Sequence, residues 1–190
     1  VEARRPMQLA TLFDATKIAF SNRVFRYAVA VQTVLFAALF CQISLIQPVF
    51  EQYYDRAENF PKWFGLIAII TMSASVINAK IVGRFGMRKI IQTALSGQVV
   101  FAGLVTVFFV AIGALPFWLF FLWALSVMFM VGFTLGNLNA LAMEPMGKIA
   151  GMAASISGGI ATILSAVIAM GITVAFDGTP LVMSAGVAAC

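Results

Sequence analysis

The side chains that most often carry chemistry are scarce in this sequence. The chain contains no histidine, which excludes Ser-His and Cys-His catalysis and removes the commonest zinc ligand. Its two cysteines, Cys41 and Cys190, lie in or at apolar runs far apart in the sequence, so they indicate no disulfide framework. We expect a protein that is not an enzyme, and these residues offer no histidine-based catalytic pair or zinc site.

The carboxylates lie at the ends of the apolar runs or before the first of them, and none lies in the middle of a run. The five that border runs are Glu51, Asp55, Glu58, Glu144 and Asp177. Proton coupling inside a membrane needs a titratable group that can be desolvated and re-exposed. We expect this chain to lack such a group, with Glu144 acting as a gate or, preferably, as a charge near a helix N-terminus.

The composition is that of a membrane protein. Apolar residues make up 62% of the chain and charged residues 10%, with a mean hydropathy of +1.01, whereas soluble domains have about 45–50% and 25%. A helix of about 20 apolar residues crosses the hydrocarbon of about 30 Å. Five runs are long enough and a sixth is too short: 27–47, 63–82, 90–112, 115–136, 149–175 and 181–190.

These runs lack the alternation of barrel strands, so they predict helices. The expected fold is an all-α integral membrane bundle of six helices over residues 27–190, the last incomplete, preceded by a cytoplasmic segment, 1–26. We expect the chain to be a fragment of a longer protein.

The basic residues predict how the bundle is oriented. Only Arg56 and Lys62 lie on one side of the predicted spans, and the other ten lie on the opposite side: Arg4, Arg5, Lys17, Arg23, Arg26, Lys80, Arg84, Arg88, Lys89 and Lys148. The positive-inside rule places the more basic side, which includes residue 1, in the cytoplasm. The net charge of +5 therefore reflects topology in a lipid bilayer and predicts no nucleic-acid partner.

Residues 9–20 have a helical pattern of their own. One predicted face carries Leu9, Leu12, Phe13, Thr16 and Phe20. This spacing predicts a short amphipathic helix along the cytoplasmic surface. The alternative is a disordered linker with chance periodicity.

The link from Asn78 to Lys89 combines glycines with basic residues. Gly83 and Gly86 permit a sharp turn, and the neighbouring Arg84 and Arg88 can anchor to headgroups. The plain alternative is an ordinary positive-inside loop. Asn78, Arg84, Gly86 and Arg88 resemble the loop signature of the major facilitator superfamily. Gly83 stands where that signature has an aspartate and Ala79 where it begins with glycine, as is common in a C-terminal half.

Small residues recur every four positions beyond the fourth span. One predicted ridge is Gly147, Gly151, Ser155 and Gly159, and a second is Ala150, Ala154, Gly158 and Thr162. Such ridges let a neighbouring helix backbone come close. We expect helix packing here, and ligand contact is the alternative.

The same region is similar to the Bcr/CflA-type multidrug:proton antiporters of that superfamily. The residues that carry the likeness are Asn137, Asn139, Ala140, Ala142, Met143, Pro145, Ala150, Gly151, Ala154 and Ser155. The resemblance implies the C-terminal half of a twelve-helix, proton-coupled exporter in the bacterial inner membrane, without a cofactor. It also implies an N-terminal six-helix half as partner, which would hold the coupling carboxylate.

Substrate sites of such transporters lie near the bilayer midplane. Gln32, Phe36 and Phe40 on the first span are the predicted cavity-lining residues, because polar side chains in a membrane usually face a bundle or cavity. Phe129 and Phe133, with Met130, could add a soft apolar wall for amphipathic compounds. The alternative for each is ordinary packing, and Gln98 is expected to be structural.

Two other functions stay open at this stage. One is a major facilitator transporter of a metabolite such as a sugar or amino acid, although these spans contain no charged partner for a polar cargo. The other is a membrane subunit without transport activity. An intramembrane hydrolase would need paired aspartates or a Ser-His dyad within its spans, and the sequence has neither.

Overall fold

The computed structural model describes residues 9–190, which are helical almost throughout and contain no strand. The helices are α1 (Leu9–Ser21), α2 (Arg23–Gln52), α3 (Phe60–Phe85), α4 (Met87–Ile112), α5 (Phe117–Met143), α6 (Ala150–Val174) and α7 (Pro180–Ala189), with short 3₁₀ turns η1 (Ala57–Asn59) and η2 (Glu144–Ile149). The predicted all-helical fold is confirmed for this range.

Four continuous helical stretches are long and apolar enough to cross a membrane, and the last of them, Phe117–Val174, spans 58 residues. That stretch reverses at Gly147, where the backbone is non-helical, so α5 and α6 are separate helices that run in opposite directions. Even α6, with 25 residues, is about 37 Å long, which exceeds the hydrocarbon thickness of about 30 Å. The chain is therefore a helical membrane protein.

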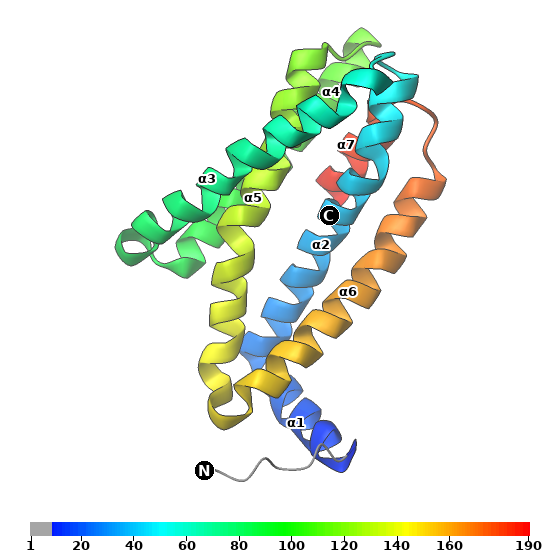
Figure 1. Cartoon of the computed structure of the whole chain (residues 1–190). Helices are drawn as coiled ribbons and strands as arrows, with labels where there is room; N and C mark the ends of the chain where they lie inside the picture. Colours follow the sequence, from blue (N-terminus) through cyan, green and yellow to red (C-terminus); the bar gives the residue numbers. More distant parts are fainter. Residues whose placement is uncertain (1–8) are drawn as a thin grey trace.

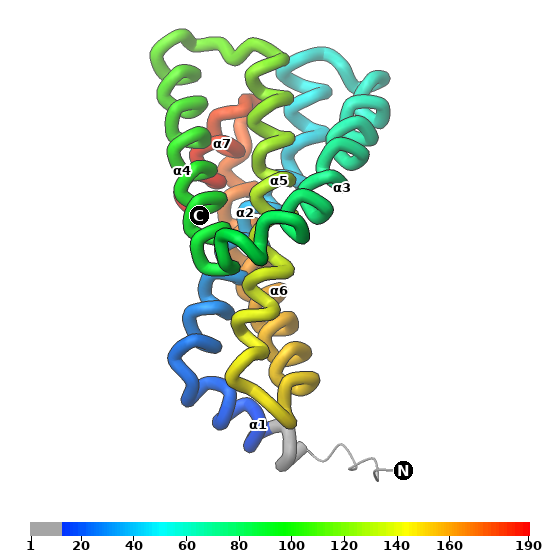
Figure 2. The backbone as a smooth tube through the Cα atoms, turned by 90° about the vertical axis from the view of Figure 1, so that its left-hand side faces the viewer, coloured from blue at the N-terminus to red at the C-terminus, as the bar shows by residue number. Residues whose placement is uncertain are grey.

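Successive long helices run in opposite directions (Figure 1). The links that contain Gly86 and Gly147 point toward the end where α1 lies, and the other links lie at the opposite end (Figure 1). Basic residues are concentrated in α1, at the start of α2 and in these two links. The two basic links thus face the same direction, although the α3–α4 turn lies about midway along the bundle and the α5–α6 turn lies beside α1 (Figures 1 and 2).

Helix α2 is the centre of the bundle and packs against α5, α6 and α7. It begins at Arg23 rather than near residue 27, because the Oδ1 of Asn22 accepts hydrogen bonds from the N–H groups of Val24 (2.9 Å) and Phe25 (3.2 Å). Such a cap satisfies donors that the first helical turn leaves unpaired. The first spanning helix is therefore longer than its apolar run.

The link between α3 and α4 is tighter than the sequence indicates. Helix α3 continues through Gly83 to Phe85, and α4 starts at Met87. Only Gly86, at φ 78° and ψ 149°, leaves the helical region, and L-residues with a side chain rarely adopt a positive φ. The prediction that two glycines form this turn is wrong, because one suffices.

Helix α6 packs against α2 through a different ridge of small residues from those predicted. Its buried positions, four residues apart, are Ala153, Ser157, Ala161, Ser165 and Ala169. Gly147 lies outside the helix, in the turn. At Gly151 and Gly159 a Cβ would meet no atom within 4 Å beyond the helix itself, and Ser155 is exposed. The predicted ridge is thus uncovered in this structure.

Helix α1 exists as predicted, and among the described side chains of its predicted face Phe20 packs on the bundle whereas Phe13 does not. Ala15 and Ala19 are buried, whereas Phe13 is 75% exposed. Phe20 packs edge-to-face on Phe25 at 5.3 Å between ring centroids. The exposed side around Phe13 is available to a membrane surface, as expected of an interfacial helix.

Side-chain hydrogen bonds stabilise the link between α4 and α5, at the end of the bundle opposite α1. The backbone N–H of Leu115 donates to the Oη of Tyr53 (3.0 Å), and the Oη of Tyr54 donates to the carbonyl of Leu115 (2.9 Å). Burial, followed by the proximity of Tyr53, raises the pKa of Tyr54 above its ordinary value. The α4–α5 link is thereby tied to the end of α2.

The start of α7 is also held by side chains. The Oγ1 of Thr179 donates to Asp177 (2.7 Å) and accepts from the N–H of Leu181 (3.3 Å). Hydrogen bonds from the side chain and then the backbone of Thr179 lower the pKa of Asp177. Beyond this cap, α7 runs back into the bundle and packs against α2 and α4 (Figure 2).

Candidate substrate-binding surfaces

Gln32, Phe36 and Phe40 lie along one side of α2, which we call the α2 face. Gln32 is buried, while Phe36 and Phe40 are half-buried and stack at 6.0 Å between ring centroids. The Nε2 of Gln32 is 3.4 Å from the Oδ1 of Asn139 on α5. Helices α5 and α6 pack on α2 from two sides and diverge from their shared turn (Figure 1). Phe36 and Phe40 are therefore a partly covered surface, and they line none of the grooves described below.

The α2 face offers a partly exposed aromatic surface next to a buried amide, whose Nε2 donates to Asn139. Aromatic rings stack on other rings with about 0.5–1.5 kcal/mol beyond the area buried, and an amide can both donate and accept. Among the described residues, the Asp, Glu, Lys and Arg side chains of α2 to α6 all lie within about two turns of a helix end. The surface therefore suits an amphipathic molecule and contains no fixed charge of its own.

Phe129 and Phe133 lie elsewhere. Their rings are 6.1 Å apart, and they line a groove of about 360 Å³ between α4 and α5, which we call the α4–α5 furrow. Gln98 and Met130 also line it, whereas none of the three residues of the α2 face does. The predicted cavity residues thus belong to two separate surfaces.

Gln98 forms a hydrogen bond between two helices and also has an unpaired donor. It is buried, and its Oε1 accepts a hydrogen bond from the Oγ of Ser126 on α5 (3.0 Å), while its Nε2 is buried without a partner. Polar bonds of this kind link transmembrane helices. The bond to Ser126 supports the predicted structural role, and the unpaired amide adds a donor at the furrow.

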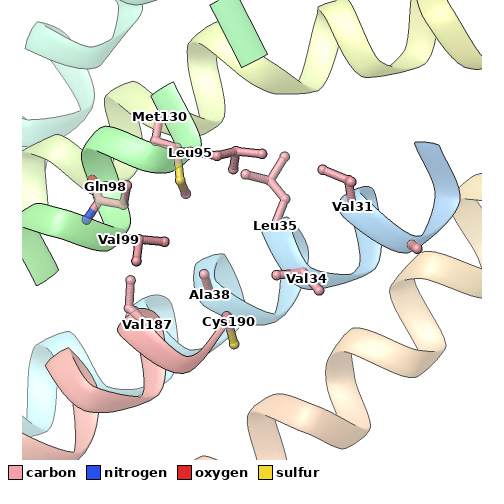
Figure 3. Close-up of a pocket in the computed structure, with 11 residues that line it drawn as sticks. Val31, Val34, Leu35, Ala38, Leu95, Gln98, Val99, Met130, Val187 and Cys190 are labelled. Carbon is pink, nitrogen blue, oxygen red and sulfur yellow. The ribbon is translucent and has the colours of Figure 1, made fainter. Parts of the chain in front are cut away.

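A second groove lies between α2, α4 and the end of α7 and holds about 310 Å³. Figure 3 shows Leu35 and Ala38 of α2 facing Leu95 and Val99 of α4, with Cys190 at its edge. Gln98 is its one polar lining side chain apart from the thiol of Cys190. The groove is an apolar surface beside α7, and it does not include the α2 face.

The residues of the predicted cytoplasmic loop motif have two different surroundings. Asn78 lies inside α3, and its Oδ1 accepts a hydrogen bond from the Nδ2 of Asn137 on α5 (2.8 Å). Arg84 and Arg88 are exposed on either side of Gly86. Asn78 therefore links α3 to α5 through a hydrogen bond, while the two arginines are exposed at the turn.

Sequence reasoning did not identify Asn139 as the hydrogen-bond partner of Gln32, or Ser126 as the partner of Gln98. Both are polar residues in apolar helices, and the rule that selected Gln32 would have selected them too. No group of three or more His, Cys, Asp or Glu side chains that could hold a metal occurs in the described part of the chain.

Comparison with known proteins identifies no relative. No protein-family model matches the chain, and no curated protein and no solved structure matches it either. The resemblance to the major facilitator superfamily therefore stays a prediction that depends on the motifs above.

Proposed function

We propose that this chain forms the C-terminal half of a major facilitator transporter of the Bcr/CflA type, which exports varied amphipathic compounds in exchange for protons. The bacterial inner membrane, with α1 in the cytoplasm, is the proposed location. The observation that carries the cargo class is the α2 face, where Phe36 and Phe40 are partly open beside Gln32. A sugar or amino-acid transporter would usually need charged partners for its cargo, and the interiors of α2 to α6 contain no Asp, Glu, Lys or Arg.

The other half of the transporter would cover surfaces that are uncovered in this chain. Gly151, Ser155 and Gly159 form an exposed small-residue strip on α6, and such strips accept a close helix. Alternating access would then rock the two bundles around the α2 face. The proton-coupling carboxylate would lie in the second bundle, since α2 to α6 have none in their interior.

Dye efflux tests the proposal. Bacteria that express the full-length transporter, with its proposed N-terminal half, should retain less of a fluorescent aromatic cation such as ethidium than cells with an empty vector. A protonophore should abolish the difference. Replacing Phe36 and Phe40 by alanine should weaken dye recognition about two- to 13-fold per ring, from the energy of aromatic contacts.

Phe108→Ala is the matched control, because Phe108 is exposed on α4 and lines none of the grooves described above. Efflux should be unchanged in this variant at equal expression. If retention equals that of empty-vector cells over a broad panel of apolar compounds, the drug-export assignment is wrong. Uptake or export of a labelled sugar or amino acid instead would support the metabolite alternative.

A further inference from the structure

A groove beside the α3–α4 turn combines an apolar floor with a basic mouth. It holds about 440 Å³ and is lined by Ile81, Phe85, Lys89, Ile90, Thr93, Ala94 and Phe133. Helix α5 lies between α3 and α4 (Figure 2), and its Phe133 forms the floor. Thr93, Ala94 and Phe133 also line the α4–α5 furrow, so the two open grooves adjoin along α4; together we call them the channel.

The mouth of this channel is positively charged. The guanidinium of Arg84 lies 5.5 Å from the ring centroid of Phe85, and the ammonium of Lys89 lies 5.9 Å from it. Arg88 and Lys80 are exposed nearby on the same turn and helix. Within the described residues, no carboxylate forms an ion pair with Arg84 or Lys89.

No nearby helix supplies a neutralising charge. From Asn59 to Met143 the sequence contains no Asp or Glu, and this range includes all of α3, α4 and α5. The basic mouth therefore attracts an anion and repels a cationic amphiphile. Clusters of four or more Lys and Arg beside transmembrane helices are typical of anionic lipid recognition.

The length of the channel fits one leaflet of a bilayer. Its lining residues on α4 extend from Lys89 to Phe101, a rise of about 18 Å. Half of the hydrocarbon core is about 15 Å thick. An acyl chain that starts at a headgroup beside Lys89 would therefore follow the channel to about the bilayer midplane, near the unpaired amide of Gln98.

We propose that this channel is a binding site for one anionic phospholipid, with its phosphate at Arg84 and Lys89 and an acyl chain along Phe85, Thr93 and Phe133. The inference rests on the membrane-spanning fold and not on the proposed export of drugs. It separates the lipid site from the α2 face, whose residues take no part in the channel.

Native mass spectrometry of the purified protein tests the site, with dioleoyl phosphatidylglycerol as the probe and dioleoyl phosphatidylcholine as the zwitterionic comparison. We expect one phosphatidylglycerol to bind preferentially. The double change Arg84→Gln and Lys89→Gln should weaken that binding roughly 25-fold, from about fivefold per basic residue. The control pair Lys17→Gln and Lys148→Gln removes two exposed charges in α1 and η2, away from the α3–α4 turn (Figure 2), and should leave binding within about twofold.

A second pair of variants tests the acyl channel. Thr93→Phe fills the point shared by both hollows, whereas Ser96→Phe places the same ring at an exposed position on α4 that lines neither. Only Thr93→Phe should reduce the bound lipid. Equal binding of the two lipids, or equal losses in a variant and its control, would overturn the site whatever the outcome of the efflux assay.

Discussion

Replacing Gly132 by alanine should lower the melting temperature of the protein, whereas the same change at Gly136, one turn away on α5, should not. A Cβ at Gly132 would lie 2.8 Å from the Cβ of Ala74 on α3, and unbonded carbons prefer about 3.5–4.0 Å. Overpacking of this kind costs about 1–3 kcal/mol. Each kcal/mol corresponds to about 2–4 °C in a domain of this size.

Thermal unfolding can be followed through Cys41, which is fully buried, with a thiol-reactive fluorophore in a Cys190→Ser background. Gly136 is a suitable control because a Cβ there meets nothing within 4 Å. Adding Ala74→Gly to Gly132→Ala moves the methyl group from one helix to the other and should recover part of the loss. If Gly132→Ala and Gly136→Ala melt together, α3 does not cross α5 at this point.

Replacing Gly147 by alanine should destabilise the reversal between α5 and α6. Gly147 has φ 49° and ψ −118°, a conformation that is open to glycine and strained for other residues, at about 1–3 kcal/mol. The melting temperature should therefore fall by several degrees, measured in the same thiol assay. The change adds one methyl group and removes no contact.

Gly151→Ala is the matched control for Gly147. Gly151 lies in the first turn of α6, and a Cβ there would meet nothing within 4 Å outside the helix. Alanine is the better helix former by about 0.5–1 kcal/mol, so this variant should be unchanged or slightly more stable. Equal destabilisation by both changes would instead favour the predicted ridge on which the two glycines share one packing face.

The small-residue ridges of α6 show which part of the fold could be predicted from the sequence. Small residues occur every four positions on several faces of α6, so the spacing predicts close packing without choosing the face. The buried face carries Ala153, Ser157 and Ala161, because the alignment of α6 against α2 is decided by tertiary contacts. That Gln32, Phe36 and Phe40 share one side of α2 was predictable, because residues four apart lie on the same face of a helix; their role in binding stays a prediction.

Helix existence was predictable, and helix ends were less so. Apolar runs indicate where lipid surrounds a helix, but a helix can continue beyond the lipid when its ends are capped, as Asn22 does for α2. Gly83 and Gly86 look equivalent in the sequence, yet only Gly86 has a positive φ. The separation of Phe129 and Phe133 from Phe36 depends on how five helices pack, which no local pattern contains.

Sidedness tests the central claim that these helices cross a membrane with the basic turns on the inside. Asn59→Cys in η1 and Phe85→Cys before Gly86 place exposed thiols at opposite ends without changing the charge, again in the Cys190→Ser background. In intact cells a membrane-impermeant maleimide should label the cysteine at 59 and should label the one at 85 only after permeabilisation. Equal labelling of both cysteines in intact cells would contradict the orientation and, with it, the proposed transporter.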